Sequence, residues 1–221
     1  MSNIEKAELG SVGSGAHQVV SQPTGRKLGN PGPIGVFAFS STTLVLSLYN
    51  AQARSITHPN VVVGMACFVG GLAQLLAGQW EIAVGNTFGA TAFTLYGGFW
   101  MSYAAILIPG TGILAAYADY PDQLKSALAI YLLSWTILTF LLFLGTLRRS
   151  IAFILLFGAL DITFLLLCVG DFTHNTSIVK AGGGMGVVTA IIGYYVGTSE
   201  ILTRDRSYFQ LPLGQIAPRL D

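Results

Sequence analysis

The residues of this chain that could do chemistry are polar side chains embedded in long apolar runs. Gln74 and Asn86 carry amides and Tyr96 carries a phenol, and each group can donate a hydrogen bond without bearing a charge. Gln74 shares one helical face with small residues at positions 67, 70, 71 and 78, so we expect its amide to point into a helix bundle. There it either bonds a neighbouring helix or lines a wet path.

Few carboxyl groups lie within the apolar runs. Such groups usually indicate a transport or proton path. Asp161 lies in the fifth run, where it could carry a proton or pair with Arg148 and Arg149. We favour the pairing. Glu81 follows Trp80 at the turn between the second and third runs, so we expect it at a membrane interface, with a possible charge or proton role.

No residue pattern of a common enzyme is visible in the sequence. His17, His58 and His174 lie far apart and outside the apolar runs, so neither a Ser/His/Asp set nor metal-ligand spacing is present. Cys67 and Cys168 fall inside apolar runs and are interpreted as small buried hydrophobes. The net charge of +1 argues against nucleic-acid binding, which needs concentrated basic surface. We therefore predict a non-enzyme without a cofactor or metal.

The composition indicates a membrane protein. Of the 221 residues, 52% are hydrophobic and only 10% are charged, against about 25% charged in soluble domains. Six runs approach the length of about 20 residues that crosses a bilayer. They cover residues 32–49, 60–77, 84–108, 127–146, 151–170 and 182–202. The sequence thus predicts an all-α membrane protein: a six-transmembrane-helix bundle around a pore (residues 29–202), a disordered tail (1–28) and a C-terminal tail (203–221).

The distribution of basic residues predicts the orientation of the bundle. With six spans both termini share one side, and that side collects eight of the 11 Lys and Arg residues. The eight are Lys6, Arg26, Lys27, Arg148, Arg149, Arg204, Arg206 and Arg219. The other side has Arg54, Lys125 and Lys180. Since an excess of Lys and Arg stays in the cytoplasm, both tails are expected to be cytoplasmic.

The first apolar run opens with a helix-start pattern. Asn30 is a good N-cap, and Pro31 and Pro33 fit the first turn, where no intrahelical partner awaits the missing N–H. The free N–H groups and the dipole at this end favour anions. With Arg26 and Lys27 they would form a positive vestibule on the inner side.

Four ordered sequence blocks resemble those of one transporter family. They are residues 30–35 (NPGPIG), 70–74 (GGLAQ), 85–100 (GNTFGATAFTLYGGFW) and 143–147 (FLGTL). On these blocks the chain is similar to the acetate uptake transporter family, also called the succinate–acetate permease family. The resemblance implies a plasma-membrane transporter of acetate and other short acids, including succinate, that forms a homo-oligomer of six subunits.

The resemblance also implies a narrow point formed by Phe39, Tyr96 and Leu160. Asp161 departs from the apolar or hydroxyl residue expected beside that point. Thr87 is a further candidate pore residue, although it starts a hydroxyl stripe with two later threonines almost opposite Tyr96. Both faces of this helix cannot look into one pore, and we interpret the stripe as bonding its own carbonyls or an adjacent helix.

The function expected from these features is proton-coupled transport of acetate. A bare carboxylate in apolar surroundings is costly, so it must be neutralised or met by donors. One alternative is a channel for a small neutral solute such as urea, an amide or ammonia, which needs the same narrow pore. Another is a membrane sensor or scaffold whose tail binds a cytosolic partner.

Overall fold

The structure is a computed structural model that describes residues 28–205 and 207–216. The expected tail of residues 1–28 therefore lies almost entirely outside the described residues. Within them the chain is helical, and its only β contact is an isolated bridge between Ser150 and Gln215. The long segments are α1 (Gly32–Asn50), α2 (Val62–Cys67) continued by the π-helix η2 (Phe68–Ala73) and α3 (Gln74–Ala83), α4 (Thr87–Leu107), α6 (Pro121–Thr146), α7 (Ile151–Phe172) and α8 (Thr176–Ile201). The short helix α5 (Ile113–Ala116) lies between α4 and α6.

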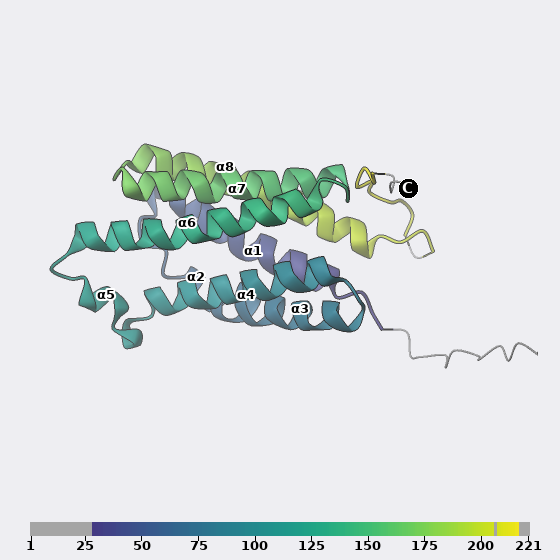
Figure 1. Ribbon diagram of the computed structural model, residues 1–221, viewed down its shortest axis with the longest axis horizontal. Helices are drawn as coiled ribbons and strands as arrows, with labels where there is room; N and C mark the ends of the chain where they lie inside the picture. Colours follow the sequence, from purple (N-terminus) through teal and green to yellow (C-terminus); the bar gives the residue numbers. More distant parts are fainter. Residues whose placement is uncertain (1–27, 206, 217–221) are drawn as a thin grey trace, which may run out of the picture.

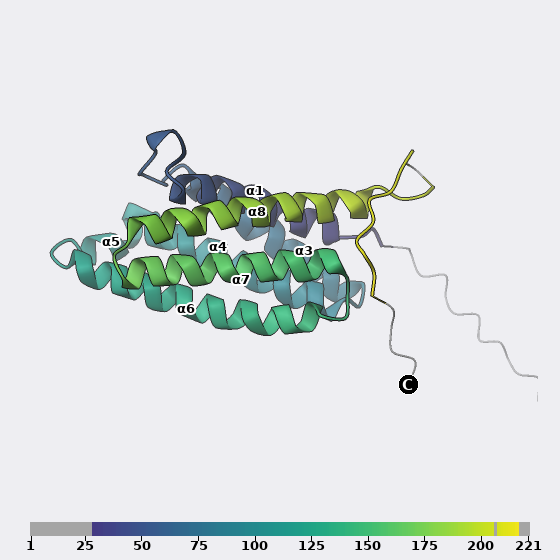
Figure 2. The same cartoon turned by 90° about the horizontal axis from the view of Figure 1, so that it is seen from above.

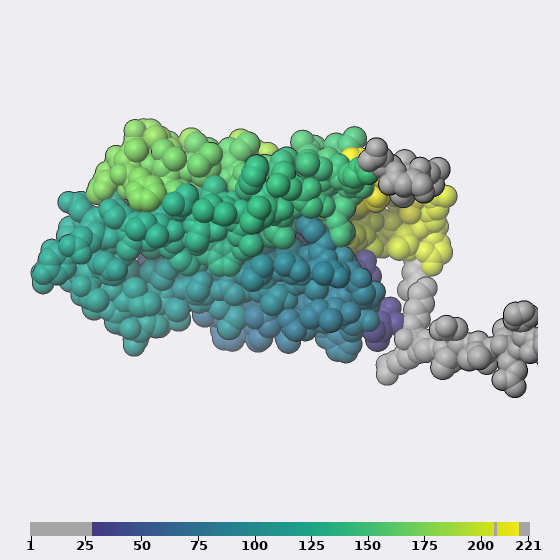
Figure 3. Space-filling model, viewed as in Figure 1, coloured from purple at the N-terminus to yellow at the C-terminus, as the bar shows by residue number. Residues whose placement is uncertain are grey.

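The long helices run roughly antiparallel along one axis (Figures 1 and 2). Helix α1 packs along α8, α8 along α7, and α7 along α6, while α3 packs along α4. The start of α1, the end of α8, the α3–α4 turn and the α6–α7 turn lie at one end, which we call the proximal end (Figure 1). The α7–α8 turn and α5 lie at the opposite, distal end. On the face shown in Figure 3, side chains of α6 and α7 adjoin those of α3 and α4 and cover the interior.

Five helical segments are long and apolar enough to cross a membrane by length and composition. They are Gly32–Asn50, Val62–Ala83, Pro121–Thr146, Ile151–Phe172 and Thr176–Ile201. Helix α4 has 21 residues, or about 31 Å of length, but it is not among the five. Its glycines, threonines and tyrosines lower its hydropathy, and its inner face is buried by the other helices.

Three helix boundaries differ from the expected ones for identifiable reasons. The second segment continues to Ala83 rather than ending at residue 77, because Glu81 is buried in the last turn. Helix α6 begins at Pro121, since proline is tolerated in a first turn. Helix α8 begins at Thr176 because the Asn175 side chain accepts the Ser177 N–H at 2.9 Å.

Glycines let α8 approach α1 closely. A Cβ placed on Gly186 would collide with Ser47 Oγ, and one on Gly193 would collide with Ser40 Oγ. Both serines are at most 4% exposed. Small residues are what membrane helices need for close contact, since lipid provides no hydrophobic drive for their association. The close contact of α8 with α1 thus depends on these two glycines.

A π-helix interrupts the second segment at Phe68–Ala73. A π turn closes i→i+5 hydrogen bonds and adds one residue, which rotates everything that follows by about 100° relative to an unbroken α-helix. Gly70 lies within it, and a Cβ there would come within 2.7 Å of Thr42 Oγ1 and 2.8 Å of the Trp100 ring. The turn ends just before Gln74 and therefore sets the direction of that side chain.

Candidate functional site

Two cavities lie inside the helix bundle, one toward each end. The distal cavity has a volume of about 210 Å³. It is lined by Phe39, Thr43, Leu46, Ser47, Asn50, Tyr96, Phe99, Trp100, Tyr103, Leu128, Tyr131, Leu132, Leu160, Thr163, Phe164, Leu167, Asp171 and Val179. The proximal cavity has a volume of about 50 Å³. It is lined by Gly32, Val36, Phe39, Gln74, Glu81, Asn86, Phe88, Gly89, Ala92, Phe93, Tyr96, Arg149, Phe153, Leu156, Phe157, Leu160 and Glu200.

Three residues line both cavities: Phe39, Tyr96 and Leu160. They come from α1, α4 and α7, and their exposed fractions are 6%, 3% and 4%. The ring centroids of Phe39 and Tyr96 are 5.8 Å apart. These side chains therefore form one apolar level between the two cavities, which we call the shared level. The structure brings together the three residues that the sequence resemblance singled out.

The Tyr96 ring is held at the shared level from several sides. Its hydroxyl group is 2.9 Å from Thr139 Oγ1 on α6, within hydrogen-bond distance. Its ring lies 6.1 Å from that of Trp135 and 6.3 Å from that of Phe157, centroid to centroid. Trp135 and Thr139 were missed at the sequence level. They are one helical turn apart in α6, and that i, i+4 spacing is the signal that could have found them.

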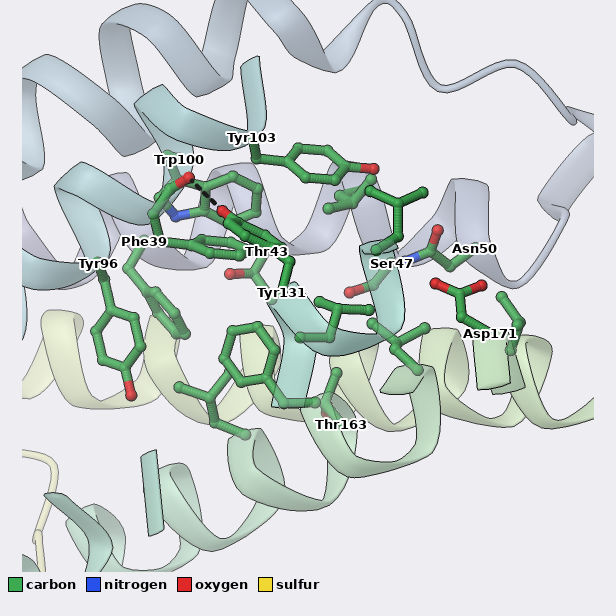
Figure 4. A pocket seen from close by; sticks show the side chains of 18 residues that line it. Phe39, Thr43, Ser47, Asn50, Tyr96, Trp100, Tyr103, Tyr131, Thr163 and Asp171 are labelled. Carbon is green, nitrogen blue, oxygen red and sulfur yellow. Dashed lines mark hydrogen bonds between the residues drawn. The ribbon is translucent and has the colours of Figure 1, made fainter. Parts of the chain in front are cut away.

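The distal cavity combines aromatic walls with polar groups at its outer end. Figure 4 shows Phe39 and Tyr96 at one end of this cavity, and Asn50 and Asp171 at the other. The lining also includes two buried polar atoms without a hydrogen-bond partner, Thr43 Oγ1 and Trp100 Nε1. Unpaired buried donors of this kind can bind a passing polar solute or water.

The proximal cavity holds an amide with no partner. Gln74 is 0% exposed, and neither Nε2 nor Oε1 makes a hydrogen bond. Of the two expectations for this residue, a bond to a neighbouring helix is absent among the described residues, and the side chain instead lines the proximal cavity. The π-helix directly before Gln74 accounts for its direction.

Two carboxylates also line the proximal cavity, and each is held by an asparagine. Asn86 Nδ2 donates to Glu81 Oε2 at 2.8 Å, and Asn30 Nδ2 lies 3.5 Å from Glu200 Oε2. Asn86 Oδ1 also accepts the Gly89 N–H at 3.2 Å, which caps α4. Glu81 is 2% exposed, and it lies in the last turn of α3.

Asn30 is placed much as the sequence predicts, at the start of the first helix. Its Oδ1 accepts the Gly32 N–H at 2.9 Å, and Pro31 already has helical backbone angles (φ −80°, ψ −14°). Asn30 does not itself line the proximal cavity, but it contacts Glu200, which does.

Arg149 is the cation that the sequence assigned to a connecting turn and the structure places at the proximal cavity. Its Cζ lies 4.2 Å from the centroid of the Phe88 ring, a cation–π distance. Burial lowers the pKa of the guanidinium from its ordinary value, and the negative charge of Glu81 partly offsets this. Arginine nevertheless stays protonated in proteins, so the cavity wall carries a fixed positive charge.

Two sequence candidates lie away from both cavities. Thr87 is exposed and accepts from Thr91 Oγ1 through its carbonyl oxygen at 2.8 Å, while Thr94 Oγ1 accepts from Gln79 at 2.9 Å. The threonine stripe therefore faces outward, because the opposite face of α4 carries Tyr96. The prediction of Thr87 as a pore residue conflicts with this placement.

Asp161 neighbours Leu160 but does not line either cavity. It lies ten residues after Ile151, where α7 begins, which corresponds to about 15 Å along a helix. Within the described residues no ion pair joins it to Arg148 or Arg149, so the favoured pairing is wrong. Its Oδ1 is buried without a hydrogen-bond partner.

Comparison with known proteins identifies relatives that are similar over most of this chain. The chain is 50% identical to "Ammonia transport outward protein 2" of Saccharomyces cerevisiae over 84% of this chain and 66% of that protein. It is 44% identical to "Acetate permease A" of Emericella nidulans, over 86% of this chain and 67% of the relative. The chain thus spans about two thirds of the length of these relatives.

A solved structure, "Structure of the bacterial acetate channel SatP", matches the fold with a TM-score of 0.76 at 35% identity. The match covers 85% of this chain and 100% of the other. With its apolar helices, the chain is thus a membrane-embedded helical protein. The family model described as "GPR1/FUN34/yaaH family" matches residues 13–217. The protein belongs to the GPR1/FUN34/yaaH family.

Proposed function

We propose that this protein carries acetate and other short monocarboxylic acids across a membrane together with a proton. The observation that carries the proposal is the pair of internal cavities that meet at Phe39, Tyr96 and Leu160. The names of two similar proteins, an acetate permease and an acetate channel, support acetate as the substrate.

The shared level supports the proton coupling by its chemistry. Two of its three side chains are hydrocarbon only, and the Tyr96 hydroxyl is already bonded to Thr139. An isolated carboxylate loses its hydration there without compensation, which is very costly, whereas a neutral acid loses far less. Short carboxylic acids resemble Glu, which titrates near pH ~4.3, so they are mostly ionised at neutral pH. Each molecule must therefore acquire a proton to pass.

The size of the proximal cavity favours small acids. A water-sized group occupies about 10–15 Å³ on this measure, so the cavity of about 50 Å³ has room for roughly four such groups. Acetic acid has four non-hydrogen atoms and succinic acid has eight. We therefore propose that acetate is preferred and that succinate passes more slowly.

Uptake of radiolabelled acetate into proteoliposomes of the purified chain tests this function. We expect uptake above that of protein-free liposomes, accelerated by an inward proton gradient. Uptake that ignores the gradient would contradict the coupling, and uptake equal to that of protein-free liposomes would contradict the substrate.

Ammonia is the second candidate, favoured by the name of a 50% identical relative. It is neutral and smaller than acetic acid, so the same apolar level would admit it. Liposomes that trap a pH indicator distinguish the two, because entry of ammonia raises the internal pH whereas entry of acetic acid lowers it. Urea competition with acetate uptake tests the wider class of small neutral solutes in the same vesicles.

We further propose that α4 completes a set of six membrane crossings, with both chain ends on the cytoplasmic side of the plasma membrane. The proximal end carries Arg148, Arg149 and Arg204, and the distal end carries Arg54, Lys125 and Lys180; the remaining basic residues lie outside the described part. The exposed apolar residues of η2, α3 and α6 support a homo-oligomer, and the sequence resemblance implies a hexamer. Native mass spectrometry measures the subunit number, and cysteine labelling from each side places the ends.

A further inference from the structure

The walls of the proximal cavity contain the same three-residue unit twice. One unit consists of Asn30, Gly32 and Glu200, and the other consists of Asn86, Gly89 and Glu81. In each, the asparagine oxygen caps the start of a helix and its amide nitrogen approaches a carboxylate oxygen. The first unit joins the start of α1 to the end of α8, and the second joins the start of α4 to the end of α3. We call them the Asn–Gly–Glu units.

The glycine of each unit makes room for the carboxylate. A Cβ on Gly32 would collide with Glu200 Oε2, and a Cβ on Gly89 would lie 2.5 Å from Asn86 Nδ2 and 3.0 Å from Glu81 Cδ. A side chain at either position would thus disturb the contact between the asparagine and the carboxylate. The two units therefore hold their carboxylates at fixed places on one cavity wall.

The charges of the cavity favour uptake of a proton. Glu81 and Glu200 share one small space, and within the described residues neither forms an ion pair. Arg149 is the one cation among the lining residues, and its guanidinium lies over the Phe88 ring. Two like charges in one small space repel each other, and a proton on either of them relieves that repulsion.

Gln74 supplies an independent indication of the ligand, because it is fully buried in this cavity with both polar atoms unpaired. An amide offers one donor group and one acceptor side by side. A neutral carboxylic acid offers the matching pair, a carbonyl oxygen and an O–H. A carboxylate has no O–H, so it would leave Gln74 Oε1 facing another acceptor. The amide thus fits the protonated acid better than the anion.

We propose that the proximal cavity is a docking site for a neutral short-chain carboxylic acid, in which Glu81 and Glu200 exchange a proton with the bound acid. The acid pairs with the Gln74 amide, and its O–H proton moves to one of the two carboxylates. The O–H bond of the acid breaks, a new O–H bond forms on the glutamate, and the acid becomes an anion. Arg149 attracts that anion, and the reverse sequence loads the cavity for export. This inference rests on the proposed function and names its proton-exchange site.

The test compares net acetate uptake with acetate exchange in proteoliposomes of the full chain. Net uptake down a proton gradient needs the proton to be released inside, whereas exchange of labelled for unlabelled acetate at equal pH moves no net proton. We compare Glu81→Gln, Glu200→Gln and the double variant with Asp119→Asn, an exposed carboxylate remote from both cavities. Glutamine keeps the oxygen that the asparagine contacts, so both units can still form.

In the double variant we expect the ratio of net uptake to exchange to fall by about tenfold or more, the lower end of what a positioned proton-transfer group contributes. Asp119→Asn should leave the ratio unchanged. An unchanged ratio in the folded double variant overturns this inference alone. Absence of any acetate flux in the wild-type protein overturns the proposed function and this inference with it.

Infrared difference spectra give a readout that does not depend on transport. Adding isotopically labelled acetic acid to the wild-type protein should change the signal of a protonated glutamate carboxyl group, and the double variant should lack that change. A change that persists in the double variant overturns the assignment to Glu81 and Glu200. The variant Gln74→Leu should weaken acetate binding by about tenfold, the upper value of one lost hydrogen bond; unaltered binding contradicts the docking role of Gln74.

Discussion

Tyr96 belongs to the shared level and is also hydrogen-bonded to α6. Its hydroxyl reaches Thr139 Oγ1 at 2.9 Å, and Thr139 is 0% exposed. A buried hydroxyl that loses its only partner costs more than the hydrogen bond itself contributes. The bond thus ties the position of the Tyr96 ring to the position of α6.

Removing one partner of this bond should cost stability, and removing both should restore most of it. We expect Tyr96→Phe and Thr139→Val each to lower the free energy of unfolding by about 1–2 kcal/mol. The double variant should be less destabilised than the sum of the two. Thermal unfolding in detergent measures this, and strictly additive losses would show that the two hydroxyls do not interact.

Leu160 closes the shared level on the α7 side. The change Leu160→Ala removes three carbon atoms between the cavities, so acids longer than acetate should be taken up faster than by the wild type. Leu155→Ala is the matched control, because Leu155 lies on the same helix and is 55% exposed. A panel of labelled acids of two to five carbons measures the change. If Leu160→Ala leaves the preference among these acids unaltered, Leu160 does not limit the size of the acid that passes the shared level.

The π-helix is the element that turns Gln74 into the proximal cavity. It lies where α1 and α4 approach the second segment, with Gly70 against Thr42 and the Trp100 ring. The periodicity of an α-helix is 100° per residue, and on that basis the sequence predicted that Gln74 lies on an inner face. The added residue of the π turn changes this direction locally and leaves no sign in the periodicity.

The change Gly70→Ala should destabilise the protein by about 1–3 kcal/mol, because the added methyl group meets two buried side chains. Gly64→Ala is the control, since a Cβ there has nothing within 4 Å. We expect this control to be neutral or slightly stabilising. The midpoints of thermal unfolding of the two variants are compared. Equal midpoints would show that the side chains around Gly70 move enough to accommodate the added methyl group.

Sequence reasoning found the helices and the family, and part of the site. The family resemblance is confirmed, and the six apolar runs correspond to the long helices. Phe39, Tyr96 and Leu160 came from the resemblance, because an aromatic residue in an apolar run usually indicates only core packing. The end of the second run was set at residue 77, whereas the helix continues to Ala83 and carries Glu81 into the proximal cavity. The sequence analysis interpreted Arg149 only as a charge in the loop between two runs. Its position beside Phe88 results from the folded turn, which the sequence does not reveal.

The whole molecule is asymmetric along its long axis, with a wide distal cavity and a narrow proximal one. The proximal end is also braced by the C-terminal segment. Gly214 O accepts the Ile151 N–H at 2.9 Å, and Leu213 O accepts the Ala152 N–H at 3.1 Å. Free N–H groups at the start of α7 thereby gain partners. The brace holds the α6–α7 turn, which carries Arg149.

Acetate uptake should depend on external pH with a definite sign. At pH values above the pKa of the acid, near ~4.3 for a Glu-like group, the neutral fraction rises about tenfold for each unit of falling pH. The initial rate at low acetate concentration should therefore rise as the external pH falls from about 7 to about 6, approaching tenfold. Protein-free liposomes supply the background to subtract, and a protein-dependent rate that is level across this range would show that the anion is the transported species.

The composition of α4 has a consequence for biosynthesis. Helix α4 carries Tyr96 and Trp100, and among the long helices of the described part it is the one outside the five that are long and apolar enough to cross a membrane by length and composition. Entry into the bilayer depends on the summed hydropathy of a segment, so we expect α4 to insert only together with its neighbours. A nascent chain released just after α4 should then remain accessible to protease, and one released after α6 should be protected. Helix α4, which contributes Tyr96 to the shared level, would thus enter the lipid only after α6 has been synthesised.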